Sequence, residues 1–174
     1  MLAQRASAAP SLGSVDVPTL YSAHWRSMVR LALHLVDDVP TAEDIVQAAF
    51  IALYRNQARL RTPDAALAYV RQAVVNGSRS TLRHRTVVRR KLAVVADDPD
   101  GAQRAAFDAV GVDIEMTAAL RTLPARMREV LVLRYYSDLS EAQIGEVLGI
   151  SAGTVKSTAS RALDKLRTTL GGAR

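Results

Sequence analysis

Residues 139–167 read LSEAQIGEVLGISAGTVKSTASRALDKLR and hold two short amphipathic patterns separated by a glycine. Ser140 followed three residues later by Gln143 forms the capping-box pattern, so we expect a helix to begin directly after Ser140. Gly149 is expected to end this helix in the left-handed conformation, which glycine adopts without steric cost. Ser151 can then cap a second helix. The stretch therefore predicts two helices joined by a tight turn.

The second helix is predicted to have two unlike faces. One face is apolar at spacings of three and four residues and must pack on the core. Its members are Val155, Ala159, Ala162, Leu163 and Leu166. The residues left on the outside are Lys156, Ser157, Ser160, Arg161 and Asp164.

This polar face suits contact with DNA. Lys156 and Arg161 are long cations that can reach guanine edges or phosphates, and the two serines are short enough for close approach. Two helices joined by a short glycine turn are typical of the helix-turn-helix, whose second helix enters the major groove. An ordinary solvated helix face is the alternative. The combined capping box, glycine turn and second cap favour DNA binding over it.

Helical patterns also fill the first half of the chain. The earliest has apolar residues at helical spacing, namely Leu20, Met28, Leu31, Ala32 and Leu35. After an Asp- and Pro-containing break, Thr41 is the expected N-cap, which puts Glu43 and Asp44 in a first turn where the helix dipole favours anions. The inward face of this second helix is predicted to be Ile45, Ala48, Ala49, Ala52 and Leu53. Pro63 marks the start of a third, long helix that is expected to continue through Gly77.

The chain divides into four zones. Residues 1–16 read as a disordered tail, and residues 92–113 read as an acidic flexible linker with at most one marginal turn. Helical patterning fills residues 17–91 and resumes in residues 114–170, where the apolar set after Pro124 is Met127, Val130, Leu131 and Leu133. We therefore expect an all-α protein of two small helical domains joined by a flexible linker.

The composition agrees with this expectation. Of 174 residues, 49% are hydrophobic and only 5% aromatic, so the core must consist mainly of small aliphatic side chains that favour helices. A formal net charge of +6 indicates a mild preference for polyanions. The absence of cysteine excludes disulfides and cysteine zinc sites, and it fits the cytoplasm. No apolar run is long enough to cross a membrane, so no membrane insertion is expected.

We find no pattern typical of an enzyme, and we expect no catalytic residue, metal or cofactor. His24, His34 and His84 are far apart and lack metal-ligand spacing. The acidic residues 97–100 lack the glycine and the distal glutamate of a calcium loop. No glycine-rich phosphate loop or paired nucleophile and base is present.

Three segments carry a resemblance to a known family. TAEDIVQAAFIALYRN (41–56), YVRQAVVNGSRSTLRHR (69–85) and the long block LRTLPARMREVLVLRYYSDLSEAQIGEVLGISAGTVKSTASRALDKLR (120–167) resemble the extracytoplasmic-function (ECF) group of bacterial RNA polymerase sigma factors. The resemblance covers residues 17–170, and the richness in Ala, Arg and Val is typical of actinobacterial proteins. It implies a promoter-specificity subunit that recognises the −10 and −35 elements.

The resemblance assigns roles to residues in both domains. The −35 contact falls to Lys156, Ser157, Ser160 and Arg161, with Arg126, Arg128, Arg134 and Tyr135 as candidate phosphate contacts. Recognition of the −10 element as melted DNA is assigned to Asn76, Arg79 and Arg83 and to the loop that carries Arg59 and Arg61. Arg85, Arg89 and Arg90 extend the basic flank, since no acid occurs between Arg79 and Lys91.

The resemblance also implies protein partners. Glu43, Asp44 and Gln47 are expected to dock on the clamp helices of the largest subunit of core RNA polymerase, and the second domain on the polymerase flap. Members of this group are usually silenced by an anti-sigma protein, so such a partner is expected here. Three positions depart from the family pattern: Tyr69 where Trp is frequent, Ser80 where an acid is frequent, and Thr158 where Arg is frequent.

Two rival functions remain open from the sequence. A stand-alone helix-turn-helix repressor or activator would use the same recognition helix but would dimerise on palindromic half-sites. A helical scaffold that binds another protein and no longer binds DNA would not depend on Arg161.

Overall fold

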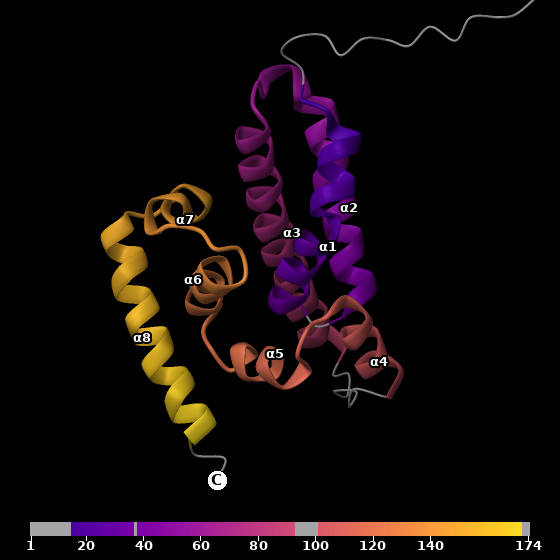
Figure 1. Ribbon diagram of the computed structural model, residues 1–174. Coiled ribbons are helices and arrows are strands. Elements are labelled where there is room, and N and C mark those ends of the chain that lie inside the picture. The colour runs from indigo at the N-terminus through magenta and orange to yellow at the C-terminus, as the bar shows by residue number, and fades with distance from the viewer. Residues whose placement is uncertain (1–14, 37, 93–100, 172–174) are drawn as a thin grey trace, which may run out of the picture.

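The computed structural model describes residues 15–36, 38–92 and 101–171. For residues 86, 88–92 and 101–103 the backbone alone is described. These ranges hold eight α-helices, one short 3-10 turn and no strand, so the all-α prediction is confirmed (Figure 1). None of the helices in these ranges combines the length and apolar character that crossing a bilayer requires.

The first domain is a bundle of three helices. It comprises α1 (Val17–Leu35), α2 (Val39–Asn56) and α3 (Pro63–Leu92), with the 3-10 turn Gln57–Arg59 after α2. The fully buried side chains at its centre include Leu31, Leu33, Val46, Leu53, Val70 and Val74. Burying each such side chain stabilises the fold by about 1.5–3 kcal/mol, so this aliphatic set contributes most of the stability of the bundle.

The first domain begins before the predicted boundary at residue 17. Val15 is buried, and the carboxylate of Asp16 accepts a hydrogen bond from the Thr19 backbone N–H at 3.3 Å, which caps α1. Residues 1–14 of the predicted tail lie outside the described residues.

The prediction that Thr41 caps the second helix is wrong. Asp38 is the N-cap, and its carboxylate accepts a hydrogen bond from the Thr41 backbone N–H at 2.8 Å. Pro40 is tolerated in the first turn because its missing N–H would have no partner within the helix there. Glu43 and Asp44 consequently lie in the second turn rather than the first.

The packing of α2 on α3 is close. A Cβ added to Gly77 would lie 3.0 Å from Cγ2 of Ile45, so the small residue in α3 lets the two helices approach. The predicted inward face of α2 is confirmed for Ile45, Ala49 and Leu53, but Ala48 is exposed. Phe50 is buried in the core instead, because the buried face of α2 is displaced by one residue position from the predicted face.

The described residues after α3, 101–171, hold five helices. These are α4 (Gly101–Val110), α5 (Ile114–Arg121), α6 (Ala125–Tyr135), α7 (Glu141–Leu148) and α8 (Ala152–Gly171). We expected at most a marginal turn in residues 92–113, so the ten-residue α4 is a correction. Phe107 on α4 is 2% exposed, and Val112 is buried beside it. Tertiary packing of these side chains stabilises α4, whose apolar pattern in the sequence is too short to predict a helix. Residues 93–100 lie outside the described residues.

The two halves of the molecule pack against each other. Helix α6 lies between α1 and α8, and six consecutive residues of α6, from Arg128 to Leu133, are therefore buried. His34 at the end of α1 contacts two residues of the second half: its Nδ1 lies 3.0 Å from Oγ1 of Thr117, and its ring centroid is 3.8 Å from that of Tyr136. Figure 1 shows α5 to α8 alongside the upright α1 to α3 bundle.

Candidate nucleic-acid interface

The predicted start of α7 is confirmed. The Gln143 backbone N–H donates to Oγ of Ser140 at 3.3 Å, and the Ser140 backbone N–H donates to Oε1 of Gln143 at 2.9 Å. Both halves of the capping box are thus formed, and α7 begins at Glu141.

The turn between α7 and α8 also has the predicted geometry. Gly149 has a φ of +67°, in the left-handed region that ends α7. The Thr154 backbone N–H donates to Oγ of Ser151 at 3.1 Å and caps α8. We did not single out Gly145, although a Cβ there would lie 2.6 Å from the backbone carbonyl oxygen of Ile150. A glycine inside a short helical pattern was the available signal for this close approach.

Helix α8 divides as its sequence pattern predicts. Val155, Ala159 and Ala162 are buried, and Leu163 and Leu166 pack against the core from its edge. The exposed side chains include the four predicted to contact the −35 element, Lys156, Ser157, Ser160 and Arg161. The short polar residues keep close to the helix, since Ser157 Oγ donates to the Thr154 carbonyl at 3.1 Å. The cations and hydroxyls therefore form one continuous outer surface.

Thr158 does not belong to this surface. Its side chain is 5% exposed, because it falls beside the apolar stripe of α8. Thr158, which stands where Arg is frequent in the family, therefore packs at this position and adds no cation to the outer face.

Two further predicted contacts lie beside the recognition helix. Arg134 and Tyr135 line one hollow of about 280 Å³ together with Lys156 and Ser160. The Arg134 guanidinium pairs with Glu141 at 3.0 Å and lies 5.9 Å from the centroid of the Tyr135 ring. The end of α6 thus presents a cation and a phenol next to the polar face of α8.

The other pair on α6 behaves differently from the prediction. Arg128 is 9% exposed and lies in the interior of this arrangement, and its assignment as a phosphate contact stays a prediction. Arg128 is buried because α6 packs against other helices on both sides. Arg126 is exposed, but it donates to the Leu148 carbonyl at 3.2 Å and lies 3.5 Å from the carboxylate of Glu129.

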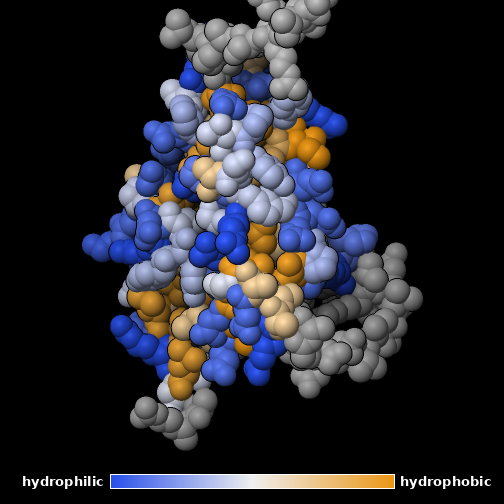
Figure 2. Space-filling model, turned by 45° about the vertical axis from the view of Figure 1, so that its right-hand side comes forward, coloured by the Kyte–Doolittle hydropathy of each residue, from blue (hydrophilic) through white to orange (hydrophobic). Residues whose placement is uncertain are grey.

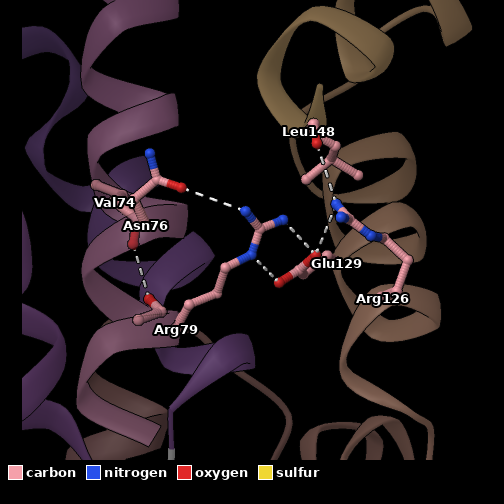
Figure 3. Close-up of polar contacts among 7 residues, drawn as sticks. Val74, Asn76, Arg79, Arg126, Glu129 and Leu148 are labelled. Atoms are coloured by element: carbon pink, nitrogen blue, oxygen red, sulfur yellow. Dashed lines mark hydrogen bonds and ion pairs between the residues drawn. The ribbon is translucent and has the colours of Figure 1, made fainter. Parts of the chain in front are cut away.

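The residues assigned to the −10 element lie along α3 and the loop before it. Arg59, Arg61, Asn76 and Arg83 are exposed. Arg79 is not free: its Nε and Nη2 donate to the two carboxylate oxygens of Glu129 at 2.6 and 2.7 Å, and its Nη1 donates to Oδ1 of Asn76 at 3.3 Å (Figure 3). Hydrogen bonds to Glu129 raise the pKa of Arg79 above that of an ordinary arginine, although partial burial acts against this.

The basic flank after Arg79 is smaller than its sequence indicates. Arg85 pairs with Asp38 at 2.7 Å and donates to Oγ1 of Thr41 at the same distance, so it joins α3 to the start of α2. The side chains of Arg89 and Arg90 lie outside the described residues. Of the departures from the family pattern in this region, Ser80 is exposed, and Tyr69 is partly buried with its hydroxyl 3.2 Å from Nδ2 of Asn56. The ring thus fills the core with its polar end at the edge, as expected.

The residues assigned to polymerase docking form an exposed face of α2. Glu43, Asp44 and Gln47 are all exposed. The same helix exposes 46% of Ile51 and 63% of Tyr54, which sequence reasoning missed because it treated these positions as ordinary members of a helical pattern. Figure 2 shows hydrophobic side chains in separate patches among hydrophilic ones on the face it presents. Among the residues that the structure describes, no three His, Asp or Glu side chains are grouped to hold a metal ion.

Comparison with known proteins identifies both domains. Residues 20–87 match the Sigma-70 region 2 family and residues 119–168 match Sigma-70, region 4. The RNA polymerase sigma-E factor of Streptomyces coelicolor is 32% identical over 143 residues, which are 81% of this chain and 78% of the relative. The ECF RNA polymerase sigma factor SigL of Mycobacterium tuberculosis is 31% identical over 173 residues, which are 95% of each chain. The chain belongs to the ECF group of RNA polymerase sigma factors.

Solved structures share the fold of this sigma factor. The sigma factor RpoE of Bartonella quintana, solved in complex with the anti-sigma factor NepR, superposes with a TM-score of 0.71 over 91% of this chain and 99% of that chain, at 23% identity. CnrH, solved in complex with the cytosolic domain of CnrY, gives a TM-score of 0.69 over 91% of this chain and 89% of that one, at 22% identity. In this sigma factor α4 lies between the segments that match regions 2 and 4.

Proposed function

We propose that this sigma factor binds core RNA polymerase and directs it to promoters through contacts with a −10 and a −35 element. The observation that carries the proposal is the helix-turn-helix of α7 and α8, whose outer face presents Lys156 and Arg161 in a chain that also holds a region 2 bundle. A helix with buried small aliphatic residues behind it and cations in front fits the DNA major groove.

The −35 contact belongs to α8. Lys156 and Arg161 reach bases or phosphates, while Ser157 and Ser160 permit close approach and donate hydrogen bonds. Arg134 and Tyr135, beside the same face, contact the adjoining backbone. Phosphate contacts give affinity and base contacts give specificity. Replacing a residue that contacts phosphates is therefore expected to lower the affinity for DNA, and replacing one that contacts bases is expected to lower the specificity for the promoter sequence.

The −10 contact belongs to α3 and the loop before it. Asn76, Arg79 and Arg83 approach the melted strand, and Arg59 and Arg61 flank the loop that receives an unstacked base. Unstacking a base costs a few kcal/mol, and contacts from polar groups and cations must offset that cost.

Docking on the polymerase belongs to α2. Glu43, Asp44 and Gln47 supply polar contacts to the clamp helices, and the neighbouring Ile51 and Tyr54 supply the apolar contact that such an interface needs. The second domain contacts the flap. This assembly takes place in the cytoplasm.

An anti-sigma protein is proposed as a further partner. The two solved relatives by fold, RpoE and CnrH, are each bound to a protein partner, and the partner of RpoE is an anti-sigma factor. A partner that covers the exposed face of α2 would keep this sigma factor from the polymerase. Affinity purification of the chain from its own cells, followed by identification of stoichiometric partners, tests this.

Transcription in vitro tests the main proposal. Transcripts induced by overproduction of the chain are mapped to find a promoter, and that promoter is transcribed with core polymerase with and without the purified chain. A start-site-specific transcript that requires the chain supports the proposal, and its absence on every mapped promoter refutes it. Tight binding of the chain alone, as a dimer, to a palindromic duplex would instead indicate a stand-alone regulator.

A further inference from the structure

One buried carboxylate joins the two domains. Glu129 on α6 has a side chain that is 5% exposed, and it receives a two-point ion pair from Arg79 on α3. The guanidinium of Arg126, one turn earlier on α6, lies 3.5 Å from the same carboxylate. Figure 3 shows Arg79 extending from its own helix across to Glu129, with Arg126 on the opposite side.

The proposed function gives Arg79 a contact at the −10 element, and the family resemblance makes Arg126 a candidate phosphate contact at the −35 element. A carboxylate and a phosphate both accept parallel hydrogen bonds from the planar fork of arginine. Arg79 already directs Nε, Nη1 and Nη2 to protein oxygens, and Arg126 directs Nη1 to Glu129 and to the Leu148 carbonyl. Neither guanidinium can engage a phosphate fully while these contacts are kept.

The interface around this ion pair includes a space that is open to solvent. A cavity of about 610 Å³ lies next to it, between α3 and α6, with an apolar lining that includes Leu35, Leu82, Val87 and Ala125. Other polar contacts across the interface include the bond between Arg26 and the Ala109 carbonyl at 3.3 Å and the contact of His34 with Thr117. An interface with an open cavity loses less packing when it separates than a filled one does.

We propose that Glu129 is an interdomain latch: by pairing with Arg79 it holds the free sigma factor in a closed arrangement in which Arg79 is withheld from DNA. The inference rests on the proposed function for its meaning, but the latch itself is a property of the free chain. Opening releases Arg79 from Glu129, and the polymerase then spaces the two domains for a promoter. Leaving one partner of a part-buried ion pair alone is strongly unfavourable, so removal of either partner shifts the chain toward the open form.

The distance between the domains in the free chain tests the latch. The sequence has no cysteine, so Ser22→Cys on α1 and Thr168→Cys on α8, both exposed positions, accept a fluorescent donor and acceptor without competing sites. Single-molecule energy transfer is compared for the labelled parent, Glu129→Gln and Arg79→Gln. We expect each substitution to lower the ratio of closed to open molecules by roughly tenfold or more. Glu141→Gln is the matched control, because it removes an arginine–glutamate ion pair, at 3.0 Å from Arg134, within one domain.

The possible results separate cleanly. Opening in Glu129→Gln and Arg79→Gln, with no change in Glu141→Gln, supports the latch. A folded Glu129→Gln or Arg79→Gln chain, judged by circular dichroism, that keeps the parent's distance distribution overturns it, and so does equal opening in all three variants. If Glu129→Gln does not fold, Arg79→Gln decides alone, since Arg79 is part-exposed. None of these readouts uses polymerase or promoter, so failure of the proposed function would appear separately, as the absence of a transcript.

Discussion

At the residue scale, His34 at the end of α1 has a pKa far below that of a free imidazole. It is 1% exposed, and burial, the largest cause, lowers its pKa from 6.5 to about 4. The nearby Asp113 carboxylate acts to raise the pKa, and Arg30 acts to lower it. The neutral ring is therefore the form that packs on Tyr136 and Thr117. Because the unfolded chain binds a proton at this histidine more readily, the stability that neutral His34 contributes is fully present above pH 6.5. That contribution is lost as the pH falls toward 4.

A dependence of stability on pH follows. Between pH 8 and pH 5, His34 is expected to lower the free energy of unfolding by about 2 kcal/mol. Urea denaturation at a series of pH values measures this. His34→Gln should flatten the change over that range, whereas His84→Gln, at an exposed position, should retain it. Equal slopes for the parent and His34→Gln would show that His34 titrates normally.

At the scale of elements, the turn between α7 and α8 places the recognition helix. Gly149 needs a left-handed backbone, and Gly145 leaves room for the carbonyl of Ile150. The two glycines therefore fix how α8 leaves α7. A substitution at either glycine is therefore expected to change the angle between α7 and α8.

Substitution of these glycines is expected to be costly. Gly149→Ala should lower the free energy of unfolding by about 1–2 kcal/mol, the cost of a left-handed alanine. Gly145→Ala should cost more, since a backbone atom 2.6 Å from the new Cβ must move. Gly153→Ala is the control: its Cβ meets nothing closer than 3.9 Å, and alanine favours a helix. If thermal denaturation showed Gly153→Ala to be less stable than Gly149→Ala and Gly145→Ala, this account of the turn would be wrong.

The outer face of α8 supplies a test of promoter recognition. Arg161→Glu places an anion where the proposal puts a phosphate or a guanine, so transcription from a cognate promoter should fall at least about tenfold, equivalent to about 1.4 kcal/mol. Lys165→Ala, which removes an exposed cation further along the same helix, should have little effect. Quantified transcripts from core polymerase with each variant give the answer. Unchanged transcription with Arg161→Glu would show that Arg161 does not contact the promoter.

The elements differ in how far sequence could predict them. The capping box at Ser140 and the turn at Gly149 were predictable because each is a local rule about a few adjacent residues. The burial of Arg128 and the helix around Phe107 were not, because both result from packing between segments distant in the chain. The N-cap at Asp38 was missed because Thr41, three residues later, satisfies the same residue preference. The pairing of Arg79 with Glu129 likewise depends on how the two domains meet.

At the scale of the whole molecule, the two domains carry DNA contacts that are useful only together. Each domain offers a small surface, so the affinity of the chain for a promoter depends on both being engaged at one spacing. We propose that the closed arrangement, with α6 packed between α1 and α8, is not that spacing, since it pairs Arg79, a proposed DNA contact, with Glu129 of the other domain. The polymerase must therefore hold the domains apart at a defined distance.

The spacing between the two promoter elements is the most direct test of this claim. Insertion of about five base pairs between the −35 and −10 elements turns one element to the opposite side of the helix. We predict that transcription by core polymerase and this sigma factor is lost with the insertion, because α8 and α3 can no longer reach both elements at once. Equal transcription from the parent and inserted promoters would contradict the account, since it would mean that the two domains do not read one promoter jointly.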